Sequence, residues 1–346
     1  MILHVVSEAD TEITRSNGEQ IPQLLLTCPE NVQLHYHELC VADQYPACYP
    51  ILASLPKLTI HSWLTALQTE RLEQKAQLIT QRLKHCNSNW EDAFFITLAR
   101  NFGFGLNGDA FETWAGLLPF RAMDKHRNDL FQIEAFFYGL AGLLEETLLK
   151  KEQEDEYSLR LCKEFRYLQR KFEIGQGMDA TLWRFLRLRP ENFPHIRLAQ
   201  LAYLYQKGDK LFSRLLEAET LADVRTLLDA RTSPYWENHY LFGRLSSQKE
   251  KAMGERSKDL IIINTVVPFL YTYGLHKADE RMCERAGRFL EELKAESNHI
   301  IRSWSDAGLP VVSAADSQAL IQLQKEYCDK RKCLYCRFGY EYLKHT

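Results

Sequence analysis

The 346-residue chain lacks several features that would place a protein in a function class at once. Its 43 Lys and Arg residues do not exceed its 46 Asp and Glu residues, which excludes a uniformly basic nucleic-acid binder but not a basic patch. Its longest apolar run, from Leu260 to Leu270, is interrupted by Asn264 and Pro268. A membrane span needs about 20 apolar residues, so the sequence predicts no such segment.

Secretory and catalytic signatures are also missing. No Lys or Arg precedes the apolar residues 2–6, and Ser7 and Glu8 follow them directly, which is not the pattern of a signal peptide. The nine cysteines are therefore interpreted mainly as reduced thiols of a cytoplasmic protein. The motifs of serine hydrolases, P-loop proteins, HExxH zinc proteases and protein kinases do not occur. The sequence thus predicts no catalytic residue.

The chain does have a large aromatic content, with 18 Phe, 16 Tyr and 6 Trp, which can form an extensive core. Residues 1–58 predict a buried strand at residues 2–6, a hairpin across Asn17-Gly18, and a connector that contains three prolines. Helical periodicity begins at about Ser62 and continues toward the C-terminus. The expected fold class is α+β: a small, incomplete β-rich piece (1–58) packed on a large, mostly α-helical domain (59–346) with a C-terminal cysteine loop.

A glycine motif and one apolar segment need a structural interpretation. Residues 103–108 match the G-x-G-x-x-G pattern, but the preceding residues have helical rather than strand periodicity. We expect these glycines to end one helix and lead into the next, with Asn107 as its cap. The β-branched segment that begins at Leu260 is expected to be helical, and Asn264 is expected to make structural hydrogen bonds inside it.

The strongest chemical signal is the C-terminal loop with Cys328, Cys333 and Cys336 at C-x4-C-x2-C spacing. Three close thiolates favour a soft ion, so the loop predicts a zinc ion or an iron–sulfur cluster. The alternative is a set of reduced thiols that pack the C-terminal turn. A fourth ligand is not local, and the candidates are Cys162, Cys283, His276, His299 and His345.

A second, weaker metal pattern lies near the N-terminus. If residues 35–40 form a strand, His35 and His37 lie on one of its faces, with Cys48 as the nearest further ligand. No second matching pair of ligands stands out in the sequence, so this pattern is much weaker than the C-terminal cysteine loop.

Arginine is concentrated in residues 183–197. Arg184, Arg187, Arg189 and Arg197 surround a turn stiffened by Pro190 and Pro194, and guanidinium groups on a rigid turn suit phosphate recognition. Residues 160–214 hold twelve Lys and Arg against five Asp and Glu. The alternative is that these arginines tie helix ends to acidic neighbours such as Glu191.

Several long segments together resemble the bacterial family catalogued as domain of unknown function 2851. They are residues 2–6, 183–194, 197–202, 263–268, 316–323 and 327–336. The resemblance covers essentially the whole chain. It implies that relatives begin several dozen residues earlier, with an aspartate and a glutamate-x-histidine on successive strands, similar to the core of restriction-endonuclease-like metal-dependent nucleases. None of those residues occurs here, so the chain is expected to be N-terminally truncated and inactive as a nuclease.

The resemblance and the arginine turn together predict a nucleic-acid-associated protein with DNA or RNA as its partner. In this interpretation Arg184, Arg187, Arg189 and Arg197 contact phosphate, and Cys328, Cys333 and Cys336 hold a structural metal. The alternative from a different class is a protein–protein interaction or scaffold module with a structural metal site and no nucleic-acid role.

Overall fold

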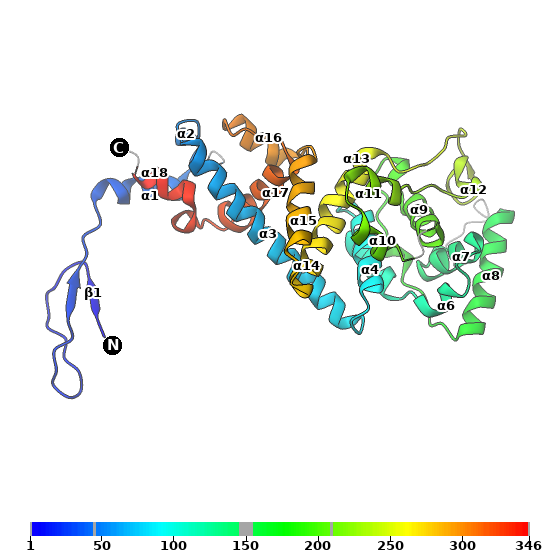
Figure 1. Cartoon of the computed structure of the whole chain (residues 1–346), viewed down its shortest axis with the longest axis horizontal. Coiled ribbons are helices and arrows are strands. Elements are labelled where there is room, and N and C mark those ends of the chain that lie inside the picture. Colours follow the sequence, from blue (N-terminus) through cyan, green and yellow to red (C-terminus); the bar gives the residue numbers. More distant parts are fainter. Residues whose placement is uncertain (1, 44–45, 145–154, 208–209, 345–346) are drawn as a thin grey trace. The chain divides into compact units, whose positions relative to one another are not determined.

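The computed structural model describes residues 2–43, 46–144, 155–207 and 210–344, and these are mostly helical (Figure 1). Two sheets of two strands each are the only sheets in these ranges. The expected fold class, mostly helical with a small β-rich piece, is confirmed. No helix within the same ranges is long and apolar enough to cross a membrane.

The chain divides into two compact units that are not two halves of the sequence. The first, here called the terminal unit, combines residues 1–71 with residues 294–346, and the second, the central unit, is residues 72–293. The N-terminal segment and the cysteine loop therefore belong to the same unit. This division does not coincide with the boundary expected near residue 58.

The terminal unit begins with a parallel strand pair, β1 (His4–Val6) and β2 (Gln23–Leu25). The predicted hairpin lies between the strands: Thr14 pairs with Gln20, and Gly18 has a φ of +83° at the turn. Glycine reaches this conformation without a steric penalty. The expected burial of the first strand is wrong, because Val5 is 50% exposed.

Helices make up the rest of the terminal unit, with part of α3 extending into the central unit. They are α1 (Glu30–Val41), α2 (Tyr49–Leu52), α3 (Lys57–His85), α16 (His299–Asp306), α17 (Ala314–Gln322) and α18 (Arg337–Lys344). Their buried side chains meet in one apolar core around Trp304 and Phe338, which also contains Cys48 and Cys336. Serine and aspartate at the start of α17 form the capping box expected at Ser313 and Asp316.

The first and last of these helices pack side by side in this unit. The Tyr342 hydroxyl of α18 donates to Glu38 of α1 at 3.0 Å, and His35 Nδ1 lies 3.3 Å from the Leu343 carbonyl. The strand expected at residues 35–40 is therefore wrong. In a helix, side chains two positions apart do not share a face, so His35 and His37 do not form the expected ligand pair.

The central unit has a large aromatic core. Its elements are α4 (Trp90–Phe102), α5 (Gly108–Gly116), α6 (Phe120–Asp124), α7 (Leu130–Leu140), α8 (Glu156–Phe172), α9 (Pro194–Lys207), α10 (Leu211–Glu217), α11 (Leu221–Leu227), α12 (Pro234–Glu237), β3 (His239–Leu241), β4 (Arg244–Leu245), α13 (Glu255–Ile261), α14 (Val267–Lys277) and α15 (Glu280–Glu292). Fully buried rings such as Trp114 and Phe137, whose centroids are 4.7 Å apart, fill the space between helices.

Both interpretations of the unusual segments are confirmed in this unit. Residues 262–266 form a π-helical turn that joins α13 to α14, and Asn264 accepts a hydrogen bond from Lys75 at 3.1 Å. Gly103 follows the last residue of α4, where a Cβ atom would lie 2.4 Å from the backbone nitrogen of Gly108. The glycine motif is therefore a tight turn between helices.

Asn107 occupies the expected cap position at the start of α5, where its backbone carbonyl accepts a hydrogen bond from the Phe111 amide at 2.9 Å. Its side chain makes no capping hydrogen bond to α5. It instead exchanges two hydrogen bonds of 2.8 Å with the backbone of Arg184, at the start of the arginine-rich turn.

Candidate functional site

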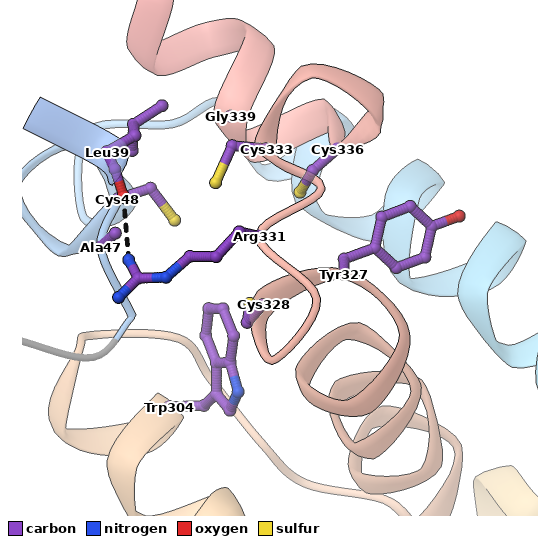
Figure 2. Close-up of a pocket in the computed structure, with 10 residues that line it drawn as sticks. All are labelled: Leu39, Ala47, Cys48, Trp304, Tyr327, Cys328, Arg331, Cys333, Cys336 and Gly339. Atoms are coloured by element: carbon purple, nitrogen blue, oxygen red, sulfur yellow. Dashed lines mark hydrogen bonds between the residues drawn. The ribbon is translucent and has the colours of Figure 1, made fainter. Parts of the chain in front are cut away.

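Four cysteines line one small cavity in the terminal unit. Cys328, Cys333 and Cys336 come from the C-terminal loop, and Cys48 comes from the residue before α2. Figure 2 shows these side chains around one central space, with Cys48 and Cys333 pointing into it from different elements. The remaining walls are largely apolar and include Leu39 and the ring of Trp304.

The chain reaches this arrangement through a sequence of tight turns. A π-helical segment, Leu323–Cys328, continues α17 and ends at the first cysteine. The loop then folds back, because the Lys332 amide donates to the Tyr327 carbonyl at 2.8 Å and Arg331 has a φ of +51°. A single 3-10 turn, Cys333–Tyr335, presents the second cysteine and leads directly to the third. Backbone geometry thus sets the spacing of the three thiols.

Cys336 occupies the position just before α18 and has several donors around its sulfur. Burial raises the pKa of its thiol, and the backbone N–H groups of Gly339 and Phe338 offset this only in part. Donors at a helix N-terminus stabilise a thiolate. Gly339 is required for this approach, because a Cβ atom there would lie 2.2 Å from the Cys333 carbonyl oxygen.

Burial and mutual repulsion keep the thiols protonated in the absence of a cation. Burial raises the pKa of Cys48 most, and the neighbouring Cys336 and Cys333 raise it further. Burial also raises the pKa of Cys328, followed by the effects of Cys336 and Cys48. A soft cation would displace their protons and remove the repulsion.

One basic side chain crosses the same cavity. The Arg331 guanidinium donates to the Leu39 carbonyl at 3.1 Å and extends between the cysteines of Figure 2. A fixed positive charge at this place partly balances the negative charge that a set of thiolates would carry.

The donor set fits a thiolate-bound metal in its chemistry, and the side chains would have to rotate to bind one. Within the described ranges, no three Cys, His, Asp or Glu side chains are already grouped closely enough to hold an ion. All four cysteines line the same cavity, so binding an ion would require their sulfur atoms to move closer together.

The sequence identifies three of these cysteines and misses the fourth. Cys162, Cys283 and His276 lie in the central unit, and His299 begins α16 without lining the cavity. His345 lies outside the described residues. In the sequence, Cys48 is a candidate ligand only as a partner of His35 and His37. One feature of the sequence could have pointed to Cys48: it lies between Pro46 and Pro50 in the connector, and the cysteine loop needs a fourth ligand from elsewhere in the chain.

The structure separates the four predicted arginines into two groups. Arg184, Arg187 and Arg189 are exposed on the turn before α9, next to Leu186, which is 82% exposed. Arg197 is only 5% exposed. Its guanidinium lies 4.4 Å from the Phe104 ring centroid and donates to Gln200 at 2.8 Å, and burial lowers its pKa to about 10.

A buried polar cluster in the central unit has no counterpart among the residues that the sequence singles out. Glu134 is fully buried in α7, where its carboxylate accepts hydrogen bonds from the hydroxyls of Tyr157 and Ser233. Burial raises its pKa to about 7, and the hydroxyls of Tyr157 and Ser233 pull it back only in part. We call Glu134, Tyr157 and Ser233 the Glu134 cluster. Its members come from distant helices and share no motif.

One comparison with known proteins gives a match. The family described as protein of unknown function (DUF2851) matches residues 1–299, a span that includes Cys48 and the arginine turn and ends before the C-terminal cysteines. No curated protein and no solved structure matches the chain. Because the family match covers most of its length, the chain belongs to the DUF2851 family of proteins of unknown function.

Proposed function

We propose that the chain is a metal-binding protein in which Cys48, Cys328, Cys333 and Cys336 hold a zinc ion or an iron–sulfur cluster. The observation that carries the proposal is the meeting of four cysteines from two distant segments at one largely apolar cavity. The metal would have a structural role, because it would cross-link the segment before α2 to the C-terminal loop.

Metal analysis of the protein purified without oxygen tests this function. We expect either about one zinc per chain without visible absorption, or iron with acid-labile sulfide and visible absorption. Protein that is folded and carries neither metal would show that the cysteines are reduced thiols packing the C-terminal turn.

A second candidate function is nucleic-acid association through the arginine turn. Its support is the exposure of Arg184, Arg187 and Arg189 together on one turn, which the hydrogen bonds between Asn107 and the Arg184 backbone anchor. Arg197 is not included in this proposal, because its guanidinium packs inside the unit. Guanidinium groups in this position can pair with phosphates of either DNA or RNA.

Changing Arg184, Arg187 and Arg189 together to alanine should weaken nucleic-acid binding at low salt and flatten its salt dependence. Losing three phosphate contacts reduces the slope of log K against log salt concentration by roughly three. Fluorescence anisotropy with labelled single-stranded and duplex DNA measures both quantities. Adding Mg²⁺ to the same mixtures tests the expectation from the family resemblance that this chain does not cleave nucleic acid.

A charge-matched control separates specific contacts from overall charge. Alanine at Lys163, Arg170 and Arg214, which are also exposed in the central unit, removes the same charge and should have a smaller effect. If the two triple variants bind equally, or if the unmodified chain binds no nucleic acid at low salt, the scaffold interpretation replaces this one.

A further inference from the structure

An aromatic groove lies beside the cysteine cavity in the terminal unit. One wall is the first turns of α3, with Leu58 and Trp63, and the other is the chain from Leu334 to Tyr340. Cys336 lines both this groove and the cavity, so the cysteine loop forms part of the groove. We call this feature the aromatic groove.

Several large apolar side chains that line the groove are exposed to solvent. Tyr335 is 78% exposed, Leu58 77% and Leu334 57%, and Tyr340 is 44% exposed on the adjoining turn of α18. Isolated apolar side chains are common on protein surfaces, but a contiguous set that lines one groove marks a binding surface.

The charge around these rings is mainly positive. Residues 330–344 contain five Lys and Arg and one acidic residue, Glu341. The Lys344 amino group lies 4.3 Å from the Tyr340 ring centroid, and the Arg337 guanidinium lies 5.7 Å from it. Lys332 is exposed on the same loop. Arg337 also pairs with Glu341 at 3.1 Å, so Lys332 and Lys344 contribute the net positive charge beside the exposed rings.

Exposed aromatic faces beside positive charge complement a ligand with flat rings and a negatively charged backbone. Single-stranded nucleic acid has both, and its unpaired bases are free to stack, whereas those of a duplex are already stacked on each other. We propose that the aromatic groove binds single-stranded nucleic acid by stacking a base on Tyr335. This inference rests on the proposed nucleic-acid role but uses a surface separate from the arginine turn.

The test measures binding of fluorescein-labelled dT12 by anisotropy at low salt. Changing Tyr335 to alanine should weaken binding by at least about fivefold, which is the lower end of the loss of one base–aromatic stack. Tyr335→Trp, which keeps a stacking face, should restore it. Tyr335 is too exposed to be required for folding, and circular dichroism should show the same helix content in all variants.

Matched controls assign the effect to the groove. Tyr167 is 54% exposed on α8 of the central unit, and Tyr167→Ala should leave dT12 binding unchanged. A labelled blunt duplex of the same length should bind more weakly than dT12. The triple arginine variant still contains the groove. If adding Tyr335→Ala to that variant weakens dT12 binding, the result supports the groove even if the arginine turn has no role.

Three results would overturn the inference. They are dT12 binding that Tyr335→Ala does not change, a preference for the duplex, and no binding of dT12 at all. Self-association of the chain that Tyr335→Ala abolishes, measured by analytical ultracentrifugation, would instead assign the groove to a second copy of the protein.

Discussion

Changing Cys48 to serine is expected to abolish metal binding and to lower the free energy of unfolding by about 4 kcal/mol when the metal is present at a thousandfold excess over its Kd. The reason is that, among the described residues, Cys48 supplies the only cavity cysteine from outside the C-terminal loop. Without it, three thiolates remain on one short loop, and the link between the loop and the segment before α2 is lost.

The measurement combines metal content with urea unfolding, each with and without a chelator. The chelator should bring the unmodified protein close to the stability of Cys48→Ser and should leave the variant unaffected. Cys48→Ala tests whether burying a serine hydroxyl in the core contributes to the loss. Cys28→Ser is the control, because Cys28 is exposed in the same unit and does not line the cavity. Full metal content in Cys48→Ser would remove Cys48 from the site.

Changing Glu134 to glutamine should make the protein more stable than the unmodified chain at pH 8 and about equally stable at pH 5. Burial raises the pKa of Glu134 to about 7 in the folded protein, against 4.5 as its ordinary value. The stabilising contribution of the neutral carboxyl is therefore fully present below pH 4.5 and is lost as the pH rises through 7. The unmodified chain should lose about 2.5 kcal/mol relative to Glu134→Gln between pH 5 and pH 8.

Glutamine is the appropriate replacement because it keeps the size of Glu134 and stays neutral at every pH in the range. Urea unfolding curves of both proteins at several pH values give the difference directly. His195 also titrates differently in the folded protein, since burial lowers its pKa to about 3, but it is present in both proteins and cancels. Parallel stability curves across this pH range would contradict the buried, neutral carboxyl.

Features that depend on neighbouring residues could be predicted from the sequence. Asn17-Gly18 predicts a hairpin by itself, since a tight turn needs a residue that adopts positive φ. The capping box at Ser313 and the helix that runs from Leu260 to Leu270 also depend only on residues close together in the sequence. The prediction is wrong at residues 35–40. The sequence is interpreted as a strand there, but these residues belong to helix α1, which packs against α18.

Features that depend on distant contacts could not be predicted in the same way. Cys48 meets the C-terminal loop only because the two ends of the chain fold into one unit. Arg197 belongs to the same arginine-rich segment as Arg189 but lies within α9, where its packing on Phe104 buries it. The Glu134 cluster joins α7, α8 and the residues around α12 without any sequence motif.

The most direct test of the four-cysteine site is X-ray absorption spectroscopy at the edge of the metal that copurifies with the protein. We expect a first coordination shell made only of sulfur, at about 2.3 Å, and loss of the bound metal in Cys48→Ser but not in Cys28→Ser. A first shell of nitrogen or oxygen atoms, or folded protein that contains no metal, would contradict the four-cysteine site.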